Sequence, residues 1–349
     1  MIRKRVFIVI VVILILGLLE TGCREITGEP EIETIEDASE QEDWKISVWA
    51  AYWDLDRVQV EVRDLEKYIN NFCYFAAYFD NKNRLMLPEA ATQIFQIIEE
   101  EFDGNGWMNY LTIVNDKIEE DGTFSLKDTE LLYELFASDE DMDKHIDQIL
   151  SLTLAGGYDG IEIDYEAIKR DMDLWRLYEK FCRKLYKKAS EAGLNMRVVL
   201  EPNAPIEELT LPEGPDYIMM CYNLHGANTE PGPKADAEFI RELIEKMSGV
   251  PGNKEFAIAT GGFDWNEEGK TEAVSQIQAE GLIKEYDAEA ERDEESQCVK
   301  FVYEDTEGVK HEVWYADTVT LHYWMDIISE SGEYGISIWR LGGNKSEEF

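Results

Sequence analysis

The feature that most constrains the fold is a series of eight short apolar or aromatic segments between residue 44 and about residue 343. Each segment is five to nine residues long and rich in Ile, Val, Tyr and Phe, which is typical of strands buried on both faces. The segments are Ile46–Trp53, Asn71–Phe79, Asn109–Val114, Gly160–Glu166, Asn195–Leu200, Tyr217–Tyr222, Glu255–Gly261 and Gly335–Trp339.

Several of the intervening segments have the spacing of amphipathic helices. One helix is predicted from the apolar stripe Leu174, Leu177, Phe181 and Leu185, and another from His145, Ile149 and Leu152. Strands that alternate with helices predict βα units around a parallel sheet, and eight units predict an α/β fold of the (β/α)8 TIM-barrel type. No glycine-rich phosphate loop follows the first strand, which argues against a dinucleotide fold.

One connection, from about Asn266 to Ser331, is much longer than the others. It contains the strand-like stretches Cys298–Tyr303 and Lys310–Tyr315, separated by the turn Glu304–Gly308. We therefore predict a β-hairpin in an insertion between strands seven and eight, on the side of the barrel where loops carry function.

The N-terminus has the pattern of an export signal. Three basic residues at positions 3–5 precede an apolar run from Val6 to Leu19, which is too short to span a bilayer comfortably. Thr21-Gly22-Cys23 then resembles the lipobox of bacterial lipoproteins, with Glu20 where Leu is usual. This resemblance implies a signal peptide over 1–22 and lipidation of Cys23, which would anchor the chain to the membrane. The alternative is an uncleaved signal anchor, and both place the remainder outside the cytoplasm.

Acidic residues dominate the rest of the chain. Residues 24–43 contain nine carboxylates and one arginine, so we expect 23–43 to be a disordered acidic tether before a catalytic barrel over 44–349. The whole chain has 74 acidic and 33 basic residues, a formal charge of −41. Such a polyanion is repelled by phosphate backbones, so the charge argues against nucleic-acid binding and favours a soluble monomer.

The segment Asp159-Gly160-Ile161-Glu162-Ile163-Asp164-Tyr165-Glu166 is the most informative about chemistry. Side chains alternate along a strand, so Glu162, Asp164 and Glu166 should share one inward face. Like charges this close raise the pKa of at least one carboxyl, which supplies a protonated acid beside an ionised partner. The same row could instead bind Ca²⁺ or Mg²⁺, or form a solvated acidic strand.

This segment resembles the D-x-x-D-x-D-x-E signature of glycoside hydrolase family 18, the chitinase-type barrels. The match is Asp159, Glu162 in place of Asp, Asp164 and Glu166. The resemblance implies that Glu166 is the general acid and base, and that Asp164 orients the acetamido group of an N-acetylglucosamine. The carbonyl oxygen of that group is the nucleophile. Glu162 would belong to the substrate-binding residues and share a proton with Asp164. No cofactor or metal is implied.

Further motifs extend the resemblance over nearly the whole exported part. Met220-Cys221-Tyr222-Asn223 resembles M-x-Y-D, where Tyr222 would steady the intermediate and Asn223 would contact substrate. Trp339 would lie under the reacting sugar. Within the family, five segments are similar to bacterial cell-wall and spore-cortex-lytic members. They are residues 222–225, 231–233, Gly262–Trp265, His311–Asp317, with Ala316 in place of Glu, and Ile338–Gly342.

Aromatic side chains are candidates for sugar contacts because sugar rings present apolar faces. We expect Trp339 first, then Trp265 and Tyr52, to line subsites near strand ends, and Trp107, Trp175 and Trp324 to be core. The four histidines are too scattered for a zinc site.

The resemblance therefore predicts a retaining glycosidase that cleaves β-1,4 bonds next to N-acetylglucosamine. Its partner would be an N-acetylglucosamine-containing polysaccharide, either peptidoglycan, chitin-like oligosaccharides or N-glycans. The alternative is a carbohydrate-binding protein on a barrel that has lost turnover, since Glu162, Asn223 and Ala316 depart from the family pattern.

Overall fold

The computed structural model describes residues 45–102 and 104–349. The predicted signal peptide, the lipidation site Cys23 and the acidic tether lie outside the described residues. No helix of the described ranges has both the length and the apolar character that crossing a membrane requires.

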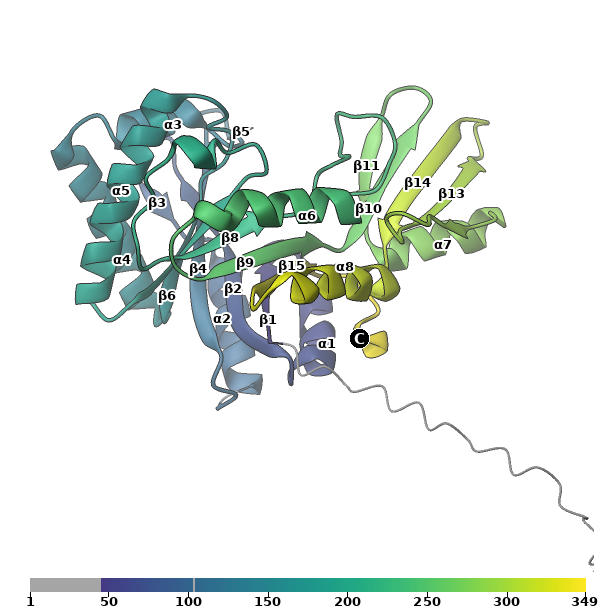
Figure 1. The fold of residues 1–349 in the computed structure, drawn as a ribbon, viewed down its shortest axis with the longest axis horizontal. Coiled ribbons are helices and arrows are strands. Elements are labelled where there is room, and N and C mark those ends of the chain that lie inside the picture. The colour runs from purple at the N-terminus through teal and green to yellow at the C-terminus, as the bar shows by residue number, and fades with distance from the viewer. Residues whose placement is uncertain (1–44, 103) are drawn as a thin grey trace, which may run out of the picture. The chain divides into compact units, whose positions relative to one another are not determined.

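Eight parallel strands form a closed barrel, which confirms the predicted fold class (Figure 1). Each strand pairs with the next, and the last strand pairs with the first, so the sheet has no open edge. The barrel strands are β1 (Ile46–Ala51), β2 (Ile69–Phe79), β4 (Met108–Ile118), β6 (Gly160–Asp164), β7 (Asn195–Leu200), β8 (Asp216–Met220), β9 (Lys254–Ala259) and β15 (Gly335–Leu341). Two short strands, β3 (Leu85–Met86) and β5 (Phe124–Ser125), pair antiparallel with the C-terminal ends of β2 and β4, respectively.

Helices cover the outside of the barrel. They are α1 (Leu55–Leu65), α2 (Glu89–Glu101), α3 (Thr129–Leu135), α4 (Asp139–Gly156), α5 (Met172–Glu191), α6 (Ala237–Lys246) and α8 (Thr318–Ser331). Of the predicted stripe on α5, Leu174, Phe181 and Leu185 are buried and Leu177 is partly buried. The first turn of α5 is capped by Asp171, whose carboxylate accepts from the Leu174 amide at 3.1 Å. Short 3₁₀ turns complete the chain: η1 (Tyr52–Asp54), η2 (Ile206–Glu208), η3 (Met247–Gly249) and η4 (Ser346–Glu348). Between β7 and β8 only η2 is found, so one helix of a regular barrel is replaced by a short turn.

The insertion between β9 and β15 forms its own five-stranded antiparallel sheet, in the order β11-β10-β14-β13-β12. The predicted hairpin is β13 (Val299–Glu304) with β14 (Lys310–Ala316). The other elements are β10 (Gly261–Asn266), β11 (Thr271–Val274), α7 (Gln276–Tyr286) and β12 (Glu291–Arg292). The insertion differs from the predicted range 266–331 at both ends. Its sheet begins at Gly261, and α8 belongs to the barrel because its apolar face packs beside α6 and β9.

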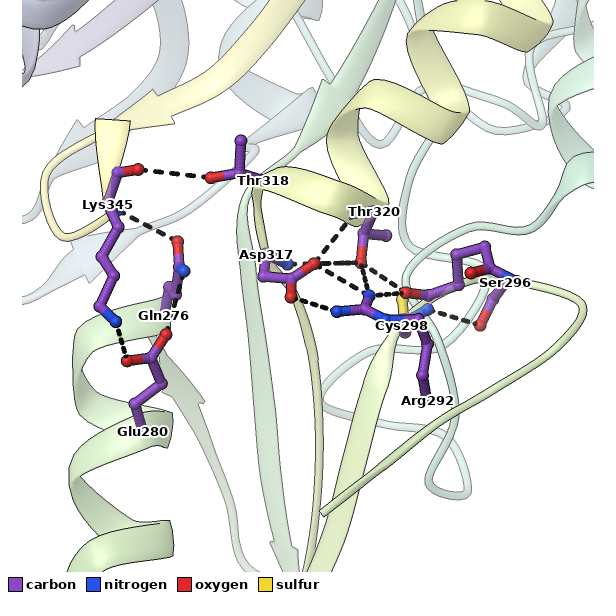
Figure 2. Close-up of polar contacts among 10 residues, drawn as sticks. Gln276, Glu280, Arg292, Ser296, Cys298, Asp317, Thr318, Thr320 and Lys345 are labelled. Carbon is purple, nitrogen blue, oxygen red and sulfur yellow. Dashed lines mark hydrogen bonds and ion pairs between the residues drawn. The ribbon is translucent and has the colours of Figure 1, made fainter. Parts of the chain in front are cut away.

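Polar contacts fix the insertion against the barrel where α8 begins (Figure 2). Arg292 of β12 forms an ion pair with Asp317 at 2.5 Å, and Asp317 also caps α8 by accepting from the Thr320 amide at 2.9 Å. The carboxylate of Asp317 raises the pKa of Arg292. Nearby, Lys345 pairs with Glu280 of α7 at 2.5 Å. The insertion is therefore tied to both α8 and the C-terminal segment.

The core has two layers that follow the alternation of each strand. Ile161, Ile163 and Tyr165 point outward and pack under the helices, as predicted from the sequence. The inside of the barrel holds a smaller cluster that includes Trp49, Tyr110 and Ile218. Glu162 and Asp164 point into this interior, so the carboxylate row lies inside the barrel.

Candidate active site

A cavity of about 720 Å³ opens where the barrel strands end. Its wall includes residues at the carboxyl ends of β6, β8, β9 and β15, together with residues of the insertion. This is the end of a (β/α)8 barrel at which active sites are found. Of the predicted site residues, the cavity brings together Asp164, Glu166, Tyr222, Asn223 and Trp339.

Glu166 lies just beyond β6, and hydrogen bonds to its main chain fix its position. The side chain of Asn115 accepts from the Glu166 amide at 2.9 Å and donates to its carbonyl oxygen at 3.1 Å. The next amide, of Ala167, donates to Glu201 at 2.7 Å, and Ala167 has a φ of 63°. These contacts direct the Glu166 carboxylate into the cavity, where its side chain is 15% exposed.

The carboxylate of Glu166 forms an ion pair with Lys127, which comes from the loop after β5. Burial raises the pKa of Glu166, and Lys127 opposes that rise without cancelling it. Burial alone would lower the pKa of Lys127, but Glu166 and Asp164 outweigh burial and raise it. Glu166 can therefore hold a proton above the pH at which an exposed glutamate loses one.

Asp164 is a buried carboxyl on the cavity wall, and it is 6% exposed. Burial raises its pKa well above the usual range, and the neighbouring carboxylates Glu166 and Glu162 raise it further. Its Oδ1 atom has no hydrogen-bond partner among the described residues. Because a buried polar atom without a partner is costly, Asp164 has capacity for a hydrogen bond to a bound ligand.

Glu162 does not reach the cavity, although the sequence analysis assigned it to substrate binding. It is fully buried one layer below, where a glutamate side chain reaches across the barrel interior. Its carboxylate accepts from Trp49 Nε1 at 2.5 Å, Thr112 Oγ1 at 2.7 Å and Arg197 Nε at 2.8 Å. These donors satisfy the carboxylate and leave no face of it for a sugar.

Arg197 of β7 connects Glu162 to a second buried acid. Its guanidinium also pairs with Glu255 at 2.7 Å, and the carboxylate of Glu255 accepts from Ser47 and Ser337 at 2.8 and 2.6 Å. Burial disfavours the charged arginine, but the neighbouring acids raise its pKa well above the usual range. An ionic floor of Glu162, Arg197 and Glu255 therefore fills the barrel beneath the cavity.

Tyr222 and Asn223 follow β8 on the cavity wall. The Tyr222 side chain is 7% exposed; burial, followed by Asp164 and Glu166, raises its pKa well above the usual range, so its hydroxyl stays a donor. Asn223 has a φ of 68°, and asparagine adopts this left-handed region more readily than most residues.

The three aromatic residues predicted to contact sugar lie in different places in the structure. Trp339 lines the cavity and packs edge-on against Trp49 and Phe75, with ring centroids 5.9 and 4.8 Å apart. Tyr52 packs against Trp53 and is not part of the cavity wall. Trp265 lies on β10 and lines a different hollow, of about 1340 Å³, beside the loop at 227–231.

The sequence motifs of the insertion meet within its sheet. Asp264 of β10 contacts His311 of β14 at 2.7 Å, and the Tyr303 hydroxyl donates to Asp264 at 2.6 Å. None of these three side chains lines the cavity that contains Glu166. These contacts link three neighbouring strands of the insertion sheet, β10, β14 and β13.

Several cavity residues were missed by sequence reasoning. Lys127, Asn115, Lys234 and Arg57 all line the cavity wall. They lie on separate loops and elements and form no spaced pattern, so no signal in the sequence identifies them before the barrel closes. In residues 45–102 and 104–349, no group of three or more His, Cys, Asp or Glu side chains is arranged to hold a metal ion.

Comparison with known proteins agrees with this architecture. The spore cortex-lytic enzyme SleL of Bacillus cereus superposes with a TM-score of 0.73 at 19% identity, covering 87% of this chain and 72% of that one. A chitinase from Chromobacterium violaceum superposes with a TM-score of 0.69 at 15% identity, covering 86% and 96%. At these identities the likeness concerns the fold, which is the (β/α)8 barrel of these enzymes.

Relatives found by sequence similarity include proteins named as glycosylases and lytic enzymes. YdhD of Bacillus subtilis, provisionally named a sporulation-specific glycosylase, is 27% identical over 230 residues, 61% of this chain and 54% of its own. The cortical fragment-lytic enzyme of B. subtilis is 26% identical over 208 residues, 53% and 47%. The chain thus spans about half the length of these relatives. No family model matches the chain.

Proposed function

We propose that this protein is a glycoside hydrolase that cleaves β-1,4 bonds next to N-acetylglucosamine with retention, using the substrate's own acetamido group. The observation that carries the proposal is that Glu166, Asp164 and Tyr222 line one cavity at the carboxyl end of the barrel. The relatives named as glycosylases and cortex-lytic enzymes support it, as do the chitinases that share the fold.

In the first step, protonated Glu166 gives its proton to the glycosidic oxygen as the bond from that oxygen to C1 breaks. The acetamido carbonyl oxygen attacks C1 and forms a cyclic intermediate. The acetamide N–H donates to the unpartnered Oδ1 of Asp164, and the Tyr222 hydroxyl donates to the acetamido oxygen. In the second step, water attacks C1 and gives a proton to Glu166, which reopens the ring. Two inversions at C1 give retention.

The ionic floor supports this assignment of protons. Arg197 compensates the charge of Glu162, so the proton that the carboxylate row holds is left to Asp164 and Glu166. Like-charged carboxyls in one buried site share a proton because both cannot ionise cheaply. Asp164 is the more deeply buried of the two, and Glu166 is the one that reaches the solvent-accessible part of the cavity.

The deciding experiment compares the wild type with Glu166→Gln on N-acetylglucosamine oligomers and purified peptidoglycan. General-acid catalysis contributes about 10²–10⁴-fold in rate, so we expect a loss of that size in kcat with unchanged thermal unfolding. Glu191→Gln, at the exposed end of α5, is the matched control. Turnover by Glu166→Gln at the wild-type rate would refute the mechanism.

A second candidate, a carbohydrate-binding protein without turnover, is favoured by one observation. Lys127 forms an ion pair with the Glu166 carboxylate and so stabilises its ionised form. A general acid must instead be protonated before it reacts. If this candidate is correct, oligomers bind with a measurable heat in calorimetry while no new reducing ends appear over long incubation. Release of reducing ends by wild type and not by Glu166→Gln would eliminate it.

A further inference from the structure

The cavity has a charge balance unlike that of the chain as a whole. Its wall carries four cationic side chains, and an equal number of acids: Arg57, Lys127, Lys234 and Arg340 beside Asp54, Asp116, Asp164 and Glu166. The full chain has more than twice as many acidic as basic residues, with a formal charge of −41. Cations are therefore concentrated at the cavity.

Two of these cations are already compensated by acids of the wall. Lys127 pairs with Glu166, and Arg340 pairs with Asp54. Both ion pairs are partly buried, so each cation is neutralised locally and offers little attraction to a further anion.

Lys234 is different because its ammonium has no acidic partner among residues 45–102 and 104–349. It donates to the carbonyl oxygen of Thr260 at 2.8 Å and lies 5.1 Å from the ring centroid of Phe263. Burial lowers the pKa of Lys234 to about 8, so it still carries its charge at neutral pH. A partly buried cation without a counterion is costly, and a bound anion would offset that cost.

Arg57 of α1 is the second cation on this wall without an acidic partner among the described residues. A Cβ placed on Gly343 would lie 3.2 Å from a guanidinium nitrogen of Arg57 and would also touch Ser275. Ser275 in turn adjoins Gly261, which follows Thr260 at the start of β10. A series of contacts through Thr260, Gly261, Ser275 and Gly343 thus connects Lys234 to Arg57.

We propose that Lys234 and Arg57 form a carboxylate-binding subsite that selects an anionic glycan, in which sugars next to N-acetylglucosamine carry a carboxylate, over a neutral N-acetylglucosamine polymer. This inference rests on the proposed function, because it names the substrate class of the same cavity. The carboxylate can come from a lactyl ether on the sugar or from a peptide attached to it. A lysine and an arginine suit either source, since both form charge-assisted hydrogen bonds with carboxylates.

The test uses four oligosaccharides of equal length. One is an N-acetylglucosamine oligomer, and one alternates N-acetylglucosamine with its lactyl-ether acid. The third is the methyl ester of that acid, which removes the charge and keeps the shape. The fourth carries a short peptide on the lactyl group. We expect kcat/KM of the wild type to be about 10- to 100-fold higher for the acid than for its ester, the effect of a hydrogen bond to a charged group.

The variants assign this preference to the two cations. Lys234→Gln and Arg57→Gln should each lower the acid-to-ester ratio by about 10-fold or more, and Lys234→Arg should retain most of it. Lys144→Gln and Arg176→Gln, on exposed faces of α4 and α5, are the matched controls. If the wild type has a higher kcat/KM for the peptide-bearing oligomer than for the ester, and equal values for the lactyl acid and the ester, the carboxylate is assigned to the peptide.

Two outcomes would overturn the subsite. One is a wild-type ratio near one with both carboxylate sources, and the other is an unchanged ratio in both Gln variants. Failure of the proposed function is distinguishable, because binding of the acid and ester to Glu166→Gln is measured in parallel by calorimetry. If no oligomer is cleaved but the acid binds about 10-fold more tightly than the ester, the subsite stands and the hydrolase assignment fails.

Discussion

At the scale of single residues, the ion pair between Lys127 and Glu166 sets the protonation of the proposed acid. Lys127 lowers the Glu166 pKa that burial raises, so the pair determines the pH at which the acid form is lost. The activity of a general acid falls as the pH rises through its pKa.

Replacement of Lys127 by methionine removes the ion pair and the hydrogen bond that favour the ionised Glu166 carboxylate. The pKa of Glu166 should rise, so the falling limb of the kcat profile should move to higher pH by about one pH unit. The measurement is kcat against pH on an N-acetylglucosamine oligomer, with Lys144→Met as the control. A limb that stays in place, or moves to lower pH, would contradict the assignment of Glu166 as the acid.

The sequence predicted the residues at this scale unevenly. Asp164, Glu166 and Tyr222 follow from motifs within single strands, and they all line the cavity. Lys127 could not be found, because it reaches Glu166 from a loop 39 positions away and has no pattern around it. Glu162 was expected at the substrate, but its partner Arg197 holds it below the cavity, and that pairing exists only once the barrel closes.

At the scale of elements, the ionic floor joins three strands of the barrel. Glu162 lies on β6, Arg197 on β7 and Glu255 on β9, and all three are buried. Removing one member of a buried ion network leaves uncompensated charge, which costs more than the network contributes.

Arg197→Met should therefore lower the free energy of unfolding by about 3–5 kcal/mol. Arg176→Met, whose side chain is 71% exposed on α5, should change it by less than about 0.5 kcal/mol. Urea unfolding followed by circular dichroism gives both values. The double variant Arg197→Met/Glu162→Gln should recover part of the loss, and equal stability of Arg197→Met and its control would show that the floor contributes nothing.

The strands themselves were predictable and the exceptions have physical reasons. Continuous apolar runs identify strands buried on both faces, whereas the short antiparallel strands β10 and β11 contain polar residues and have no such run. Their sequences therefore gave no strand signal, and the insertion was predicted as a hairpin alone. The helix missing between β7 and β8 leaves a segment with η2 only, which no strand count predicts.

At the scale of the whole molecule, polar contacts tie the first helix to the C-terminal segment. Glu61 of α1 accepts from the amides of Gly342 and Asn344 at 3.0 and 2.8 Å and from the Asn344 side chain at 2.9 Å. The C-terminal segment thus lies beside the first helix, near the anchored insertion (Figure 1).

The predicted anchor is tested on the full-length protein expressed in a bacterial host. We propose that cleavage before Cys23 and lipidation of its thiol tether the barrel outside the cytoplasm. The wild type should then enter the detergent phase on phase separation, and Cys23→Ser should enter the aqueous phase. Mass spectrometry of the N-terminal peptide checks the chemistry. A wild-type peptide that still begins at Met1, or an unmodified Cys23, would contradict the anchor.

The floor beneath the cavity has one more consequence. Arg197 has no contact with the space a sugar would occupy, yet it cancels a negative charge directly under the reacting carboxyls. In the proposed mechanism, the pH range of activity is therefore expected to depend partly on Arg197, a side chain that is fully buried beneath the cavity. Retuning that range by design would begin with the buried cation, and the visible lining of the cavity could remain as it is.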